Sequence, residues 1–144
     1  MKPIPVYRLL VLACCWLAAC STISKFDQYS YTQSTSLKVD ALNVMNQATE
    51  PYSQHQTEVA KVRLDLDKMY EYQKNRPKNE ITEKMWGVLR DTSGHLFGGF
   101  VKRWQREGKL DQVFVQEARI LVGESFDQIS QLESGKIKSV QVTN

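Results

Sequence analysis

Cysteine is scarce in this sequence. The 144 residues contain three cysteines, and all of them lie within the first 20 positions, as Cys14, Cys15 and Cys20. Residues 21–144 therefore have no thiol with which to form a disulfide or bind a metal. The stability of that region must come from an apolar core, and about 125 residues can build one such domain but not two.

Histidine is also rare, and no large excess of one charge is present. His55 lies three residues before Glu58, but di-iron bundles use the order Glu-x-x-His on two helices, and the other histidine, His95, has no such partner. Residues 20–144 contain 17 basic and 16 acidic side chains, because two of the 19 basic residues precede them. We therefore predict no metal site, and the neutral balance argues against nucleic acid as a partner.

Motifs that carry catalysis are missing as well. No serine lies in a Gly-x-Ser-x-Gly elbow, and Gly98-Gly99 is not followed by the Lys-Ser or Lys-Thr pair of a phosphate-binding loop. Asp65 and Asp67 are two residues apart, so a helix places them on different faces. These absences favour a protein that is not an enzyme.

No apolar stretch long enough to cross a bilayer follows the last cysteine. A shorter apolar run, Leu9 to Ala19, follows a basic start and ends in Leu17-Ala18-Ala19-Cys20. These four residues resemble the lipobox of bacterial lipoprotein precursors, which would make residues 1–19 a signal peptide. Cleavage before Cys14 would leave only Leu9 to Ala13 as the apolar segment, which is too short.

The resemblance implies a lipid anchor. In that family the thiol of the cysteine, here Cys20, receives a diacylglycerol, cleavage falls just before it, and its new amino group is usually acylated. Ser21, rather than Asp, at the next position implies attachment to the outer membrane, facing the periplasm. We expect contact with the membrane through this anchor and no cofactor beyond the lipid on Cys20.

A polar segment follows the cysteine. Residues 20–35 are rich in Ser, Thr, Gln and Tyr and show no sustained period, so we predict a lipidated tether there. Its aromatic residues either lie among lipid headgroups or pack against the domain: Phe26, Tyr29 and Tyr31.

A helical period begins at Leu37, with Ser36 as the expected N-cap. The stripe continues at steps of three or four through Leu42, Met45, Thr49, Tyr52, Gln56, Val59, Val62, Leu66, Met69 and Gln73. Pro51 interrupts this run, so either one long helix is kinked there or Pro51 opens a second helix. Because the stripe keeps its phase across Pro51, we prefer the kinked helix.

Two short helices are predicted next. The first has Asn79 as its N-cap, and its apolar face contains Ile81, Met85, Val88 and Leu89, with Trp86 adding bulk. The second ends at Gly108, and its aromatic residues lie at helical spacing: Phe97, Phe100 and Trp104.

A long helix follows, with Asp111 as its N-cap and Gly135 as its stop. Its apolar stripe contains Phe114, Ala118, Leu121, Val122, Ser125, Phe126, Ile129 and Leu132. Residues 36–135 are thus predicted to form a small all-α helical bundle of one long, Pro-kinked helix, two short helices and one long C-terminal helix. Residues 136–144 are expected to form a flexible tail.

One segment combines aromatic and basic side chains and is the candidate interaction surface. Its members are Phe97, Phe100, Lys102, Arg103, Trp104 and Arg106. Aromatic rings supply contact area, and cations meet an acidic partner or anionic headgroups. In the alternative, structural interpretation, which is favoured, the aromatics close the end of the core and the cations stay in water.

Three functional hypotheses follow from these observations. The first is a non-catalytic envelope lipoprotein that binds another envelope protein or has a structural role. The second is an immunity or exclusion lipoprotein that blocks a secreted toxin or a conjugation apparatus. The third is a protein that binds a lipid or cell-wall ligand in a cleft between helices.

Replacing Cys20 with Ser should abolish the incorporation of labelled palmitate into the protein in bacterial cells, because the acceptor thiol is removed. Cys14→Ser is the matched control and should remain labelled. An unlabelled wild-type protein that retains residues 1–19 would contradict the lipobox interpretation.

Overall fold

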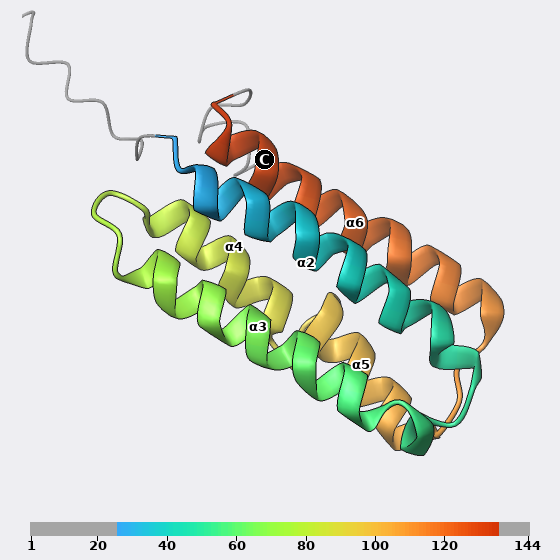
Figure 1. The fold of residues 1–144 in the computed structure, drawn as a ribbon. Coiled ribbons are helices and arrows are strands. Elements are labelled where there is room, and N and C mark those ends of the chain that lie inside the picture. Colours follow the sequence, from blue (N-terminus) through green and yellow to red (C-terminus); the bar gives the residue numbers. More distant parts are fainter. Residues whose placement is uncertain (1–25, 136–144) are drawn as a thin grey trace, which may run out of the picture.

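The computed structural model of the protein describes residues 26–135; Cys20 and the predicted tail, 136–144, lie outside the described residues. The described chain has five α-helices and no strand, which confirms the all-α bundle (Figure 1). The helices are α2 (Gln28–Asn46), α3 (Gln56–Lys74), α4 (Glu80–Arg90), α5 (Phe97–Glu107) and α6 (Gln112–Glu133), with the 3-10 turns η1 (Gln47–Thr49) and η2 (Tyr52–Gln54). None of the described helices combines the length and apolarity needed to cross a membrane.

The bundle has four sides, and α4 and α5 follow one another along the same side (Figure 1). Asp27, just before α2, accepts a hydrogen bond from Tyr72 near the end of α3, so these two helices are antiparallel. Lys38 of α2 pairs with Asp127 of α6 at 2.6 Å. The antiparallel α2 and α6 form the longest contact of the bundle.

Large side chains fill the space between the helices. The largest fully buried ones are Trp86, Trp104, Phe97, Phe126, Met45 and Leu66. Trp86 of α4 packs edge-on against Phe126 of α6, with ring centroids 5.9 Å apart. This contact brings α4 close to α6.

The first helix begins earlier than the sequence predicts. α2 starts at Gln28, and the carboxylate of Asp27 caps it by accepting from the backbone N–H of Ser30 at 3.0 Å. The predicted N-cap at Ser36 is therefore wrong, and residues 28–35, which we assigned to the tether, belong to the bundle.

Buried hydroxyl groups explain this difference. Ser30 and Ser34 face the interior of the bundle, where a hydropathy pattern does not place polar residues. Each hydroxyl has a partner on another helix: Gln73 donates to Ser30, and Ser34 lies 2.9 Å from Ser130. The hydrogen bonds compensate the cost of burial.

The kinked helix predicted at Pro51 is also wrong. α2 ends at Asn46 and α3 begins at Gln56, and the chain between them forms η1, η2 and an extended Glu50. Proline disfavours the helical conformation of the residue before it, here Glu50. The stripe keeps its phase because both helices face the same core.

The predicted apolar faces of α4 and α6 are only partly buried. On α4 the buried residues are Thr82, Trp86 and Leu89, whereas Val88 is 54% exposed. On α6, Leu121 is 51% exposed. Five residues of the predicted α6 stripe are buried: Ala118, Val122, Phe126, Ile129 and Leu132. Each predicted apolar stripe is therefore wider than the part of the helix surface that packs into the core.

Several predicted helix ends are confirmed. Asp111 caps α6 by accepting from two backbone N–H groups at 2.9 and 3.2 Å. Gly108 and Gly135 follow α5 and α6 with φ of 79° and 72°, which glycine adopts readily. Asn79 precedes α4 as predicted, but its side chain donates to Gln73 instead of capping the helix.

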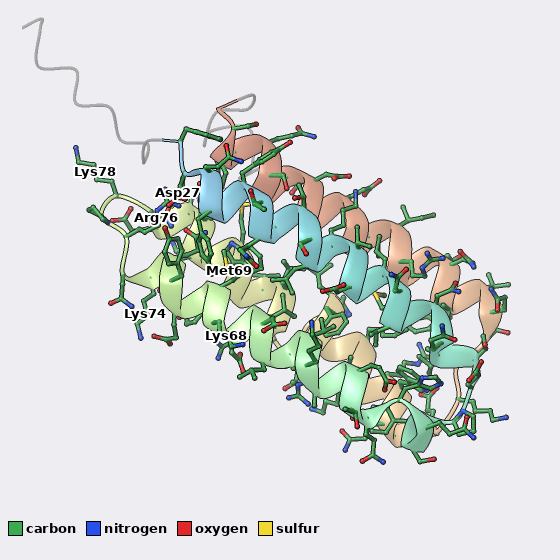
Figure 2. All side chains as sticks on the ribbon, in the orientation of Figure 1. Asp27, Lys68, Met69, Lys74, Arg76 and Lys78 are labelled. Carbon is green, nitrogen blue, oxygen red and sulfur yellow. The ribbon has the colours of Figure 1, made fainter. Side chains whose placement is uncertain are left out.

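A buried ion pair lies at the end of the bundle where α2 begins and α6 ends (Figure 2). Arg76 Nη1 is 2.9 Å from Glu133 Oε1, and Arg76 Nε is 3.5 Å from Asp27 Oδ2. The side chain of Glu133 is 3% exposed, and this burial raises the pKa of its carboxyl, although Arg76 opposes the shift. The cluster connects α2, the α3–α4 link and α6.

The break between α4 and α5 depends on two glycines. A Cβ atom on Gly98 would lie 2.2 Å from the carbonyl oxygen of Arg90, and one on Gly99 would lie 1.8 Å from that of Gly94. Asp91 stabilises the turn by accepting a backbone hydrogen bond at 2.8 Å. The start of α5 can therefore pass directly against the end of α4.

Gly99→Ala should lower the free energy of unfolding by about 2 kcal/mol or more, because the new methyl group overlaps backbone atoms. Gly87→Ala is the matched control: its Cβ would meet only a ring carbon of Tyr70 at 3.6 Å, so a helix-propensity gain of up to about 1 kcal/mol is expected. Urea unfolding followed by circular dichroism measures both, and equal stabilities would contradict the account of the break.

Arg76→Met should lower the free energy of unfolding by about 3 to 5 kcal/mol at pH 7, because Glu133 is left buried without its cation. Folding raises the pKa of Glu133, so the folded state is favoured while that carboxyl is protonated and loses stability as pH rises through the raised pKa. The cost of Arg76→Met should therefore be smaller at pH 4. The double variant Arg76→Met/Glu133→Leu should recover most of the lost free energy of unfolding. If Arg76→Met destabilises the protein equally at pH 4 and pH 7, the charge of Glu133 is not the cause.

Candidate functional site

A groove runs along α6 on the side that faces α4 and α5. We define this α6 groove by the residues of α6 that line it, which are Phe114, Ala118, Leu121, Ser125 and Gln128, with Glu117 beside Ala118. It contains a hollow of about 730 Å³ between α5 and α6 and a hollow of about 290 Å³ between α4 and α6. The lining residues recur at steps of three and four, so both hollows lie on one face of α6.

The hollow of about 730 Å³, called the wider hollow below, exists because α5 packs toward the link between α2 and α3. Trp104 Nε1 donates to the carbonyl oxygen of Glu50 at 3.0 Å, and the Trp104 ring packs edge-on against Tyr52, with centroids 5.4 Å apart. The backbone N–H of Tyr52 in turn donates to the carbonyl oxygen of Gly108 at 2.8 Å. These contacts fix the last turn of α5, at Trp104 and at Gly108, against the link between α2 and α3.

Apolar side chains form the floor and one wall of the groove. Phe100 of α5 stacks on Phe114 of α6, with ring centroids 6.0 Å apart and planes within 7° of parallel. The wall formed by α4 and the break after it contains Ile81, Met85, Val88 and Leu96. The apolar stripes predicted on α4 and α6 are therefore divided between the core and the groove.

Basic side chains border the groove, and the ones that line it are Lys84, His95, Lys102, Arg103 and Arg106. In the described chain, Glu117 is the one acidic residue among the lining residues of the two hollows. The guanidinium of Arg103 lies 4.0 Å from the centre of the Phe114 ring. Arg106 and Arg103 both bond to Glu107, at 2.7 and 3.1 Å, and these bonds lower the pKa of the Glu107 carboxyl. Glu107 therefore offsets part of this positive charge.

The structure divides the predicted interaction segment. Phe97, Phe100 and Trp104 are buried in the core, as in the structural interpretation that the sequence favoured, and Phe100 also lines the floor of the groove. The predicted cations are exposed and line the α6 groove: Lys102, Arg103 and Arg106. Their role in binding stays a prediction.

Sequence reasoning missed the wall of the groove that α4 provides. Ile81, Met85 and Val88 were assigned to the core, and Lys84 was not considered. One signal was present, because α4 carries five large apolar residues in eleven positions, more than one core-facing stripe accommodates.

A third hollow, of about 460 Å³, lies between α3 and the α4–α5 break. Its lining has two arginines and two aspartates, and one pair is in contact: Arg90 lies 3.2 Å from Asp67 and 4.3 Å from the centre of the Tyr70 ring. The pairing leaves less unbalanced charge for a ligand than the α6 groove offers.

His55 and Glu58 line a smaller hollow of about 310 Å³. His55 Nε2 lies 2.9 Å from the carboxylate of Glu50, and the His55 ring lies against Trp104, so His55 is half-buried. Among residues 26–135, no group of three His, Cys, Asp or Glu side chains is placed to hold a metal ion.

α5 and the start of α6, which line the wider hollow, lie toward the end of the bundle opposite the start of the described chain (Figure 1). Asp27 marks the end near the start of the chain, together with Arg76 (Figure 2). Phe26 and Tyr29 are exposed there, and the Tyr29 ring also packs against Tyr72, with centroids 4.9 Å apart. The wider hollow therefore lies toward the end of the bundle opposite Asp27, whereas the hollow beside α4 extends back along α6 as far as Gln128.

Comparisons with protein-family models, with curated proteins and with solved structures find no match to this chain.

Proposed function

We propose that this protein is a lipid-anchored, non-catalytic interaction module of the bacterial envelope. In this proposal Cys20 carries the lipid that attaches the chain to the periplasmic face of the outer membrane, and the α6 groove binds another envelope protein. The sequence Leu17-Ala18-Ala19-Cys20 supports the anchor.

The observation that carries the binding role is the composition of the α6 groove. Val88 lines the hollow beside α4 and Leu121 lines the hollow beside α5; each is about half exposed, and basic side chains line both hollows. Exposed apolar surface with a polar rim is typical of sites for protein partners. The lining groups offer contact area and charge, so we favour binding over a chemical reaction.

The position of the groove supports a partner away from the anchoring membrane. The chain from Cys20 to Asp27 spans at most about 25 Å when extended. α2 has 19 residues and is therefore about 28 Å long. α5 and the start of α6, which line the wider hollow, lie toward the end of α2 that is farther from Asp27 (Figure 1).

A photo-crosslinking amino acid in place of Leu121 should give a discrete protein adduct in intact cells, because this position lies in the α6 groove. The same amino acid in place of Leu64, which is 55% exposed on α3 and outside the groove, is the matched control and should not. Immunoblotting for the protein detects the adduct.

The identity of the adduct decides between the hypotheses. A resident envelope protein supports the proposal, and a secreted toxin or a conjugation component supports the immunity or exclusion alternative. No adduct from Leu121, or the same adducts from both positions, would count against the groove as the binding site.

A further inference from the structure

We infer that the α6 groove accepts an acidic amphipathic helix of about four turns, supplied by the partner protein. This inference rests on the proposed function and names the chemistry of the segment that the groove fits. Three features of the groove carry it: its length, the spacing of its apolar residues and its charge.

The length of the groove fits a helix of moderate size. From Phe114 to Gln128 the lining face of α6 covers about 21 Å at 1.5 Å per residue, which is four turns. Both long walls are helices, and ridges of side chains on a third helix can pack between them. Residues 26–135 contain no strand, so this part of the chain offers no sheet edge on which an extended peptide could pair.

The apolar residues of the groove repeat with the period of a helix. On α4, Ile81, Met85 and Val88 are separated by four and three residues, and on α6 Phe114 and Leu121 are two turns apart. A docked helix with apolar residues at positions i, i+3, i+4 and i+7 presents the matching ridge.

The charge of the groove selects an acidic partner. Lys84 and Lys102 line it, and in the described chain no carboxylate lies within ion-pair distance of either; Lys102, after the hydrogen bonds from Ser93, helps to lower the pKa of Asp91 from a longer distance. Arg103 and Arg106 share the single carboxylate of Glu107. A helix with Asp or Glu beside its apolar stripe would place carboxylates next to these cations, whereas a basic helix would be repelled.

The test uses a designed peptide of about 16 residues, with leucines on one helical stripe and glutamates beside it. The full-length purified chain is reconstituted in phosphatidylcholine nanodiscs, and binding of the fluorescently labelled peptide is followed by anisotropy. An isomer with the leucines scattered around the helix and a version with lysine in place of glutamate are the peptide controls. Both controls should bind at least about tenfold more weakly.

Variants of the protein locate the site. Lys102→Glu/Arg106→Glu and, separately, Leu121→Asp should each weaken binding of the acidic peptide at least about tenfold. Lys68→Glu/Lys74→Glu on α3 changes the net charge by the same amount outside the groove (Figure 2) and should leave the affinity unchanged. Circular dichroism verifies that each variant is folded.

Several results would overturn the inference. They are equal binding of the scattered isomer, stronger binding of the lysine peptide, no binding of the acidic peptide, or an equal loss in the α3 variant. A chain that binds phosphatidylglycerol vesicles through Lys102 and Arg106, but not the peptide, would identify a lipid surface as the occupant instead. Because this assay needs neither lipidation of Cys20 nor a cellular partner, its failure is distinguishable from failure of the proposed function.

Discussion

Close backbone packing at the α4–α5 break determines the shape of the surface on which the proposals depend. Because Gly98 and Gly99 have no side chain, α5 starts directly against the end of α4 and turns toward the link between α2 and α3. Trp104 then fastens α5 to that link. α4 stays close to α6 through Trp86, whereas α5 diverges and leaves the wider hollow. One continuous helix in place of α4 and α5 would close this space.

The two ends of the bundle have different chemistry. The end near the start of the chain is closed by charged and polar groups that bind one another, among them Asp27, Arg76 and Glu133. The other end leaves apolar and basic groups available in the α6 groove. The polar groups that bind one another and the groups that remain available to a ligand thus lie at different places along the axis of the bundle.

Residue patterns predicted the fold class and several helix ends well, because these features depend on local physics. Asp111, Gly108 and Gly135 act within one turn of their own positions. The errors concern contacts between distant segments. The start of α2 depends on Ser34 meeting Ser130, and no local pattern distinguishes such an inward serine from a solvated one. The cations of the groove could be selected from sequence, whereas its apolar wall required knowing which part of each wide stripe the core leaves uncovered.

The bonds around Asp27 also have a mechanical consequence. Asp27 is held by Tyr72 at the end of α3 and by Arg76 just beyond it, at the point where the described chain begins. A pull on Asp27 directed along the axis of α2 would act along the faces by which α2 packs lengthwise against α3 and α6 (Figure 1). Such a force shears many side-chain contacts at the same time instead of peeling them apart one by one. The bundle can therefore bear load at this end while the groove at the other end keeps its shape.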